Sequence, residues 1–276
     1  MDVVVLLKQV PDTETVIRIE PDGKAIATSD IKWVINPYDE YAVEAWVINP
    51  YDEYAVEAAL RLKDSQGANV TILSLGPQKA VESIRSALAM GADKGVLVDD
   101  PATEGSDALG KPRVLAAALK RIPFDLICCG HRALDDDENQ VGIMVAELLD
   151  LHHLALAVAL EVADGQVRIE RPIEGAKLKL EAPLPALVTL GGAHAVWNPR
   201  YASLPGIMKA KKKPLEVKKL ADIGLAADQV GAAAAKIKVA ELKMPTPRQA
   251  GVMVPGDTAG KAKELVRLLH EEAKII

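Results

Sequence analysis

Short runs of apolar, β-branched residues alternate along the chain with longer segments in which apolar residues recur every three or four positions. The first pattern is typical of strands buried on both faces, and the second of amphipathic helices. Strands are therefore expected over residues 3–7, 69–76, 94–100, 124–130 and 185–192. Helices are expected over residues 78–91, 112–122 and 139–151, and Gly91 ends the first of them.

The steady alternation of strands and helices predicts a doubly wound, mostly parallel α/β sheet. Residues 167–182 are expected to add an antiparallel pair to this sheet. Residues 16–27 alternate in polarity around Pro21-Asp22-Gly23, which predicts a hairpin.

The composition changes after Pro205, where lysine, alanine and proline replace the strand and helix patterns. We expect residues 1–215 to form the α/β domain, including a docking loop at 198–214. Residues 216–276 are expected to form an extended arm that a short amphipathic helix at 259–276 closes. An arm with little core of its own is expected to pack on a partner subunit.

A thirteen-residue sequence at positions 33–45 is repeated without change at 46–58. Each copy contains Asn-Pro-Tyr-Asp, which has an N-cap residue, a proline for the first helical position and an acid in the first turn. The second copy, from Asn49, continues directly into the amphipathic residues 58–64, whereas Pro50 would break a helix that starts in the first copy. We therefore expect the second copy to start the helix and the first to be an insertion.

Composition and charge narrow the class of protein. Hydrophobic residues make up 49% of the chain, which is enough for a sizeable core, and the net charge of −6 argues against a nucleic-acid binder. The only two cysteines, Cys128 and Cys129, are adjacent and match neither a structural disulfide nor a zinc motif, and the histidines show no metal-ligand spacing. With no apolar run long enough to span a membrane, a soluble protein is expected, in the cytoplasm or, in a eukaryote, the mitochondrial matrix.

Ligands of parallel sheets bind outside the carboxyl ends of the strands. Of the strand ends in this chain, the one at Gly130 is the richest in polar residues, because it continues as "GHRALDDDENQVG" into a helix. Gly130 would let a ligand approach the backbone, and the start of the helix would favour an anion such as phosphate. Three aspartates would repel a phosphate, so we expect them to cap the helix or to accept hydrogen bonds from a ribose or base. A solvated acidic loop that only caps the helix is the alternative, and Lys8, after the first strand, is either a phosphate partner or a surface residue.

Residues 198–214 place apolar side chains in a segment bounded by prolines, next to four lysines. Exposed apolar residues ringed by basic ones are typical of a protein-docking surface. Lys209, Lys211, Lys212 and Lys213 would steer an acidic partner. An ordinary solvated lysine run is the alternative, and RNA binding is a weaker one because a single aromatic residue lies nearby.

Five stretches of the chain resemble the β subunit of electron transfer flavoproteins. They are "VLLKQVPDT", "INPYDEYAVEAALRLKD", "SLGPQKAVESIRSALAMGAD", "GHRALDDDENQVG" and "PRYASLPGIMKAKKKPLE". The resemblance implies a heterodimer with an α subunit that carries the redox-active FAD. It further implies that the β subunit holds an AMP, shields the flavin and docks acyl-CoA and related dehydrogenases, passing electrons to a quinone reductase at the membrane. Such a subunit is an electron carrier and not an enzyme.

The resemblance also assigns residues by position. Nucleotide contacts fall on Leu6, Asn49, Pro50, Tyr51, Asp52, Leu75, Gly130, His131, Arg132, Ala133, Leu134, Asp135, Asp136, Asp137, Glu138, Asn139, Gln140 and Val141. Docking contacts fall on Arg200, Tyr201, Leu204, Pro205, Ile207, Met208 and Lys209. No metal is implied.

Three alternatives accompany this interpretation. "KQVPDT" is similar to relatives whose β subunit binds a second FAD and bifurcates electrons. Those relatives carry "DGDT" where this chain has Asp136 and Glu138 in place of glycine and threonine, and the added carboxylates disfavour a diphosphate. An adenine-nucleotide hydrolase, which would share the α/β sheet, would need a phosphate loop after the first strand, and "LLKQVPDT" does not provide one. A protein that only senses a nucleotide would not need the long C-terminal arm.

Overall fold

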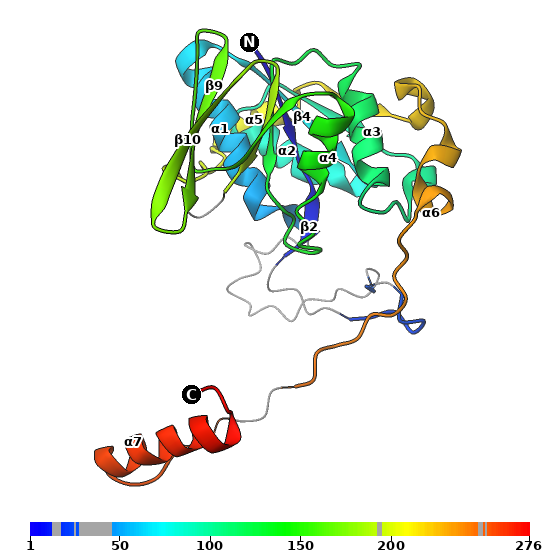
Figure 1. Ribbon diagram of the computed structural model, residues 1–276. Helices are drawn as coiled ribbons and strands as arrows, with labels where there is room; N and C mark the ends of the chain where they lie inside the picture. The colour runs from blue at the N-terminus through cyan, green and yellow to red at the C-terminus, as the bar shows by residue number, and fades with distance from the viewer. Residues whose placement is uncertain (13–17, 25, 28–45, 192–194, 248–250, 252) are drawn as a thin grey trace. The chain divides into compact units, whose positions relative to one another are not determined.

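The computed structural model describes residues 1–12, 18–24, 26–27, 46–191, 195–247, 251 and 253–276. The described residues divide into two compact units (Figure 1). The first unit comprises Met1–Arg18 and Ala27–Ala240, and the second comprises Ile19–Ile26 and Glu241–Ile276.

A seven-stranded parallel sheet forms the centre of the first unit, in the order β12-β5-β4-β1-β6-β11-β7. Its strands are β1 (Asp2–Leu6), β4 (Asn69–Leu75), β5 (Lys94–Val98), β6 (Leu126–Gly130), β7 (His152–Ala157), β11 (Ala186–Leu190) and β12 (Leu215–Lys218). The doubly wound α/β fold predicted from the alternating pattern is confirmed.

Helices cover both faces of this sheet, which explains why its strands are apolar on both sides. The four long helices of this unit are α1 (Pro50–Gln66), α2 (Val81–Met90), α3 (Gly110–Leu119) and α4 (Val141–Leu148). Val3 and Val5 pack in one core cluster with residues of α1 and α2, whereas Val4 and Leu6 pack in another with residues of α3 and α4. Alternate residues of β1 therefore pack against the helices on opposite faces of the sheet.

The chain reverses direction across the sheet at β1. From β1 it proceeds outward to β4 and β5, and then returns to place β6 on the other side of β1. Loops that follow β1 and β6 diverge at such a switch point, which leaves a crevice outside the carboxyl ends of the strands.

The expected antiparallel pair exists, but its place in the fold was predicted wrongly. Strands β9 (Gln166–Ile173) and β10 (Ala176–Pro183) pair with β8 (Ala159–Ala163) in a separate three-stranded sheet. Val162, Val167 and Ile169 bury their side chains in the cluster that contains Val3 and Val5. The small sheet thus joins the core by side-chain packing and not by extending the hydrogen-bonded ladder.

The arm begins later than expected. Strand β12 pairs with β5 as the edge of the main sheet, and Leu220, Ile223 and Val230 are buried in the cluster that contains α3. The first unit consequently extends to Ala240 and not to residue 215. Neither β12 nor β7 was predicted from the sequence.

Shorter elements complete the described chain. They are β2 (Gln9–Pro11), β3 (Trp46–Ile48), α5 (Leu204–Ala210), α6 (Gly231–Ala234) and the 3₁₀ turns Gln78–Ala80, Pro101–Thr103, Leu220–Ile223 and Ala227–Gln229. In the second unit a bridge joins Ile19 to Ile26 around the predicted turn, while residues 16, 17 and 25 of the expected hairpin lie outside the described residues. Helix α7 (Thr258–Arg267), with a π turn at Leu268–Glu272, matches the expected closing helix. None of the described helices is both long enough and apolar enough to cross a membrane.

The second copy of the repeat occupies the predicted position. Its first three residues form β3, which pairs with β2, and Asn49 then precedes Pro50 at the start of α1. The first copy, residues 33–45, lies outside the described residues.

Deletion of residues 33–45 should give a protein of equal or higher thermal stability. The deletion joins residue 32 directly to the copy that forms β3 and α1. Shortening the connection between two elements changes the entropic cost of closing it by only about 0.6 kcal/mol per halving of its length. Thermal unfolding of the deletion and the parent, side by side, measures this. A midpoint many degrees lower in the deletion would show that both copies are structural.

Candidate nucleotide site and docking surface

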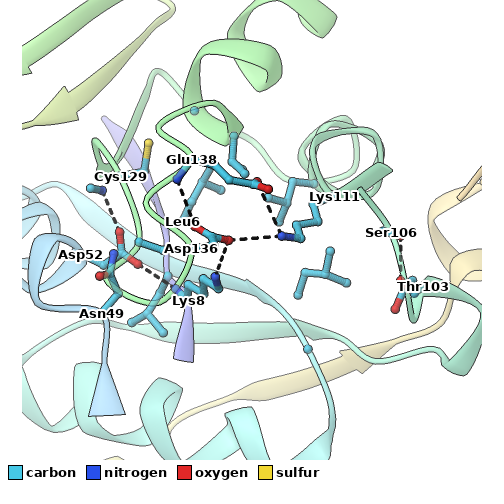
Figure 2. Close-up of a pocket in the computed structure, with 18 of the residues that line it drawn as sticks. Leu6, Lys8, Asn49, Asp52, Thr103, Ser106, Lys111, Cys129, Asp136 and Glu138 are labelled. Atoms are coloured by element: carbon cyan, nitrogen blue, oxygen red, sulfur yellow. Dashed lines mark hydrogen bonds and ion pairs between the residues drawn. The ribbon is translucent and has the colours of Figure 1, made fainter. Parts of the chain in front are cut away.

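A cavity of about 640 Å³ opens outside the carboxyl ends of β1, β4, β5 and β6 (Figure 2). Lys8 follows β1, Leu75 ends β4, Asp99 follows β5 and Gly130 ends β6, so four strand ends contribute to one cavity. The loop 130–142 forms a second wall, and the loop 99–106 forms a third. Its place at the switch point is where an open α/β sheet binds ligands.

The Asp52 carboxylate links two of these strand ends. Its Oδ2 accepts the backbone N–H of Lys8 at 2.8 Å, and its Oδ1 accepts that of Gly130 at 2.7 Å. The backbone N–H of Asn49 in turn donates to the Lys8 carbonyl at 2.9 Å. The first turn of α1 thereby fixes the spacing of β1 and β6 where they meet the cavity.

Burial raises the pKa of the Asp52 carboxyl to about 6, although the hydrogen bonds from Lys8 and Gly130 act to lower it. The side chain is buried, and two backbone N–H groups stabilise its charge.

Gly130 is required by the protein itself. A Cβ at this position would lie 2.6 Å from Asp52 Oδ1 and 2.6 Å from Tyr51 Cβ. The sequence predicted that this glycine admits a ligand to the backbone. The structure shows a reason within the protein, because the space left by the missing Cβ is taken by the first turn of α1.

Asn49 stands at the N-cap of α1, yet its side chain makes no capping hydrogen bond. Its Nδ2 instead donates to the Arg132 carbonyl at 2.9 Å, and its Oδ1 accepts the Leu134 N–H at 3.2 Å. The predicted cap is therefore wrong. Asn49 holds the loop 130–142 against α1, and its position follows from Pro50 and Asp52.

Tyr51 lies beside the cavity and orients two residues that line it. Its hydroxyl accepts a hydrogen bond from Arg132 Nη2 at 2.8 Å, and its ring meets the His131 ring edge-on at a centroid distance of 4.5 Å. His131 Nδ1 donates to the Leu190 carbonyl at 2.9 Å, and burial lowers the pKa of the imidazole. A neutral His131 with this tautomer has Nε2 left to accept a hydrogen bond.

Asp135, Asp136 and Glu138 of the acidic loop pair with lysines and do not cap α4, which was one of the two roles expected of the aspartates. Lys8 Nζ lies 2.6 Å from Asp135 and 2.9 Å from Asp136, and Lys111 Nζ lies 3.3 Å from Asp136 and 3.8 Å from Glu138 (Figure 2). Gln140, the N-cap residue of α4, makes no side-chain cap. Burial acts to lower the pKa of Lys8, but Asp135 and Asp136 more than offset this and raise it.

A second surface presents apolar side chains on α5 and on the segment just before it. Tyr201 is 98% exposed, Leu204 72% and Met208 67%. Within the expected loop 198–214, Leu204–Ala210 form a helix, because Ser203 Oγ accepts the Gly206 N–H and Pro205 lies in the first turn. Helical geometry places Leu204 and Met208 on one face.

Two basic residues of this segment, both expected at the docking surface, are engaged within the protein. Lys213 Nζ donates to the carbonyls of Leu88 and Ala92 at 2.9 and 2.6 Å, at the end of α2. Arg200 pairs with Glu57 and Asp64 of α1. Lys209, Lys211 and Lys212 are exposed, so these three carry the charge around α5.

No group of three or more histidine, cysteine or acidic side chains suited to a metal was found in the described part of the chain. Cys128 and Cys129 are buried, and burial raises the pKa of the Cys128 thiol to about 12. At neutral pH such a thiol is protonated and a poor nucleophile.

Comparisons with known proteins show the family of the chain. The family description "Electron transfer flavoprotein domain" matches residues 44–223. "Electron transfer flavoprotein subunit beta" of Bacillus subtilis (strain 168) is 40% identical over 277 residues, covering 100% of both chains. The proteins of the same name from Bradyrhizobium diazoefficiens and Mus musculus are each 37% identical, over 281 and 270 residues. The chain belongs to the electron transfer flavoprotein β-subunit family. Its match to the family description includes all of the second repeat copy and only the last two residues of the first.

Most of the positions that the family resemblance assigned to a nucleotide lie around the cavity. Those lining it are Leu6, Asn49, Asp52, Leu75, Gly130, His131, Arg132, Ala133, Asp136, Glu138, Asn139, Gln140 and Val141. Pro50, Tyr51, Leu134, Asp135 and Asp137 do not line it. Their described partners are protein groups, as for Asp137, which pairs with Arg132 at 2.8 Å.

Sequence reasoning missed the wall formed by residues 99–106 and by Lys111. The strand before this wall was predicted correctly, so its carboxyl end was a visible signal. The loop itself matches no phosphate-binding motif, and Lys111 lies in a helix whose start gave no indication of a site.

Asp52→Ala should destabilise the protein, and more at pH 5 than at pH 7.5. The variant leaves two buried N–H groups without an acceptor, which costs about 2 kcal/mol. The pKa of Asp52 is higher in the folded state than in the unfolded state, so between these two values the folded state binds more protons. The contribution of Asp52 to the free energy of unfolding therefore decreases as pH rises from about 4 to about 6. The stability gap between parent and variant should therefore be about 1 kcal/mol larger at pH 5.

Denaturant unfolding at the two pH values measures this gap. Asp39, the twin of Asp52 in the first repeat copy, offers a matched control, and Asp39→Ala should change stability by less than about 0.5 kcal/mol. Equal losses for both variants, or a gap that does not depend on pH, would contradict the assignment.

Proposed function

We propose that this chain is the β subunit of a heterodimeric electron transfer flavoprotein and holds one AMP in the cavity at the switch point. The α subunit carries the redox-active FAD, which the β subunit shields. Acyl-CoA and related dehydrogenases dock on α5, and electrons leave toward a quinone reductase at the membrane. The observation that carries the proposal is the cavity bounded by Asn49, Asp52 and the loop 130–142, in a chain of this family.

The charges around the cavity support a monophosphate over the diphosphate of a second FAD. Its cationic lining residues are Lys8, Lys111 and Arg132, whereas its carboxylates, besides the buried Asp52, are Asp99, Asp100, Glu104, Asp136 and Glu138. A single phosphate can replace Asp136 as the partner of both lysines. A second phosphate would bring further negative charge into a site that already carries more carboxylates than cations.

The docking role rests on exposed apolar residues in a basic surround. Leu204 and Met208 are largely exposed on α5, and Lys209, Lys211 and Lys212 follow them. Apolar anchors of this kind provide affinity, and the surrounding charges speed association with an acidic partner.

Exposed apolar residues of the second unit support the proposal of a heterodimer. Helix α7 exposes Leu265 and Val266, and Ile275 and Ile276 beyond it are also exposed. Exposed apolar residues at this density are typical of a surface that a partner covers. We propose that the α subunit is this partner.

Nucleotide analysis tests the ligand. Acid release from the purified heterodimer, followed by chromatography, should give one AMP and one FAD. Two FAD and no AMP would favour the bifurcating class and overturn the AMP assignment.

Leu204→Ala should slow electron transfer from a reduced acyl-CoA dehydrogenase about tenfold while AMP and FAD content stay the same. Loss of a leucine anchor from an interface costs about 1.5–3 kcal/mol. Stopped-flow reduction of the flavoprotein at several dehydrogenase concentrations measures the rate. Ile173→Ala, at an exposed apolar residue of β9, is the control and should react like the parent. A parent-like rate for Leu204→Ala would reject the docking surface.

A further inference from the structure

The segment that leads into α5 is fastened to α1 through one arginine. Arg200 Nε and Nη2 donate to the two oxygens of Glu57 at 2.7 and 3.0 Å, and the Arg200 backbone N–H donates to the same carboxylate at 3.2 Å. Arg200 Nη2 also donates to Asp64 at 2.8 Å. The Nε/Nη2 edge of the guanidinium, which forms the bidentate fork, is therefore occupied by α1.

Glu57 is 4% exposed, which makes this ion pair unlike the surface pairs of the protein. A buried carboxylate needs a partner of opposite charge, and the bidentate geometry of arginine provides both charge and direction. Among the described residues, Arg200 is the only side-chain partner of Glu57. The pair consequently fixes where the segment leaves α1.

The other end of α5 is also held. Arg85 Nη1 donates to the carbonyls of Ala210 and Lys213 at 2.6 and 2.8 Å. Within the helix, a Cβ on Gly206 would lie 2.4 Å from the Ala89 carbonyl oxygen, so the backbone of α5 lies directly on α2. Leu204 lies between these two attachments, four residues after Arg200.

Only the second repeat copy can make this attachment. Glu57 and Asp64 are seven residues apart on α1 and lie on the same face of the helix. Glu44, the twin of Glu57 in the first copy, has Tyr51 seven residues later. The first copy therefore lacks the second carboxylate.

We propose that Arg200 is a positioning residue, and that its ion pair with the buried Glu57 sets the orientation of α5 for docking. The proposal rests on the docking role of α5 given above. In this proposal Arg200 does not contact the dehydrogenase directly, because its guanidinium is already engaged by two carboxylates of α1. A neutral residue at either position would let the start of α5 move while Leu204 stays intact.

The test uses Glu57→Gln, Arg200→Gln and the double variant in the intact heterodimer, with Glu44→Gln as the matched control. The KM of a reduced acyl-CoA dehydrogenase for the flavoprotein should rise about tenfold in all three variants, because a misplaced anchor weakens docking. The kcat should stay within about twofold, and the double variant should equal the single ones, since both remove one interaction. Glu44→Gln should match the parent.

If Arg200 touches the dehydrogenase directly, Arg200→Gln alone raises KM, because Glu57 is buried and cannot reach a partner. That result, or an unchanged KM in both single variants, would overturn the proposal. If Glu57→Gln does not fold, Arg200→Lys replaces it: lysine keeps the charge but lacks the fork, so its KM should also rise.

Limited trypsin digestion separates failure of this proposal from failure of the docking role. Cleavage after Lys209, Lys211 and Lys212 should be several times faster in Glu57→Gln and Arg200→Gln than in the parent and Glu44→Gln. Faster cleavage with a parent-like KM for Leu204→Ala would mean that the ion pair positions α5 but that dehydrogenases dock elsewhere. Unchanged cleavage would show that Arg200 does not hold the segment.

Discussion

The cavity at the switch point depends on one buried carboxylate. Asp52 accepts the backbone N–H groups of Lys8 and Gly130, and so joins the ends of β1 and β6 through the first turn of α1. Parallel strands do not pair beyond their last residues, and the loops that follow β1 and β6 separate at the switch point. The ionised side chain is costly to bury, as its raised pKa shows, and two N–H donors offset part of that cost. The absence of a side chain at Gly130 is the steric counterpart of the same contact.

Helix α1 links the cavity with the proposed docking surface on α5. Its first turn bears Asn49 and Asp52 at the cavity, and its later turns bear Glu57 and Asp64 beneath the segment that leads to α5. A single amphipathic helix, packed against β1, β4, β6 and β11 by residues such as Val56 and Ala59, thus sets the position of both. This arrangement explains how the molecule can carry a thirteen-residue duplication next to its site: only the copy followed by residues 59–66 can supply all four polar side chains.

Much of the fold could be predicted from the sequence, because strands buried on both faces and amphipathic helices leave strong periodic patterns. β1, β4, β5, β6 and β11 and the helices between them lie where those patterns put them. β8 to β10 form their own sheet because their buried residues, such as Val167, contact the core from outside the main ladder, a tertiary fact that alternation does not encode. β12 was hidden in a lysine-rich segment, since an edge strand needs few apolar residues.

The site was predictable in outline and not in detail. Strand ends, glycine and an acidic loop indicated where the cavity lies, and the family resemblance added residues. What could not be read from the sequence was the partner of each polar group: Asn49 binds the loop 130–142 in place of capping α1, and Arg200 and Lys213 bind the protein in place of a partner. These pairings join residues far apart in the chain, and several side chains of the same type could equally have made them.

Calorimetric titration of AMP into nucleotide-free heterodimer tests the central claim most directly, using Asp52→Asn and its twin Asp39→Asn. The account predicts that Asp52→Asn binds AMP at least about tenfold more weakly, because an amide cannot accept both N–H groups and the ends of β1 and β6 lose their fixed spacing. Asp39→Asn should bind like the parent. Equal affinities in the two variants, or a loss confined to Asp39→Asn, would contradict the claim that the second copy, through Asp52, builds the nucleotide site.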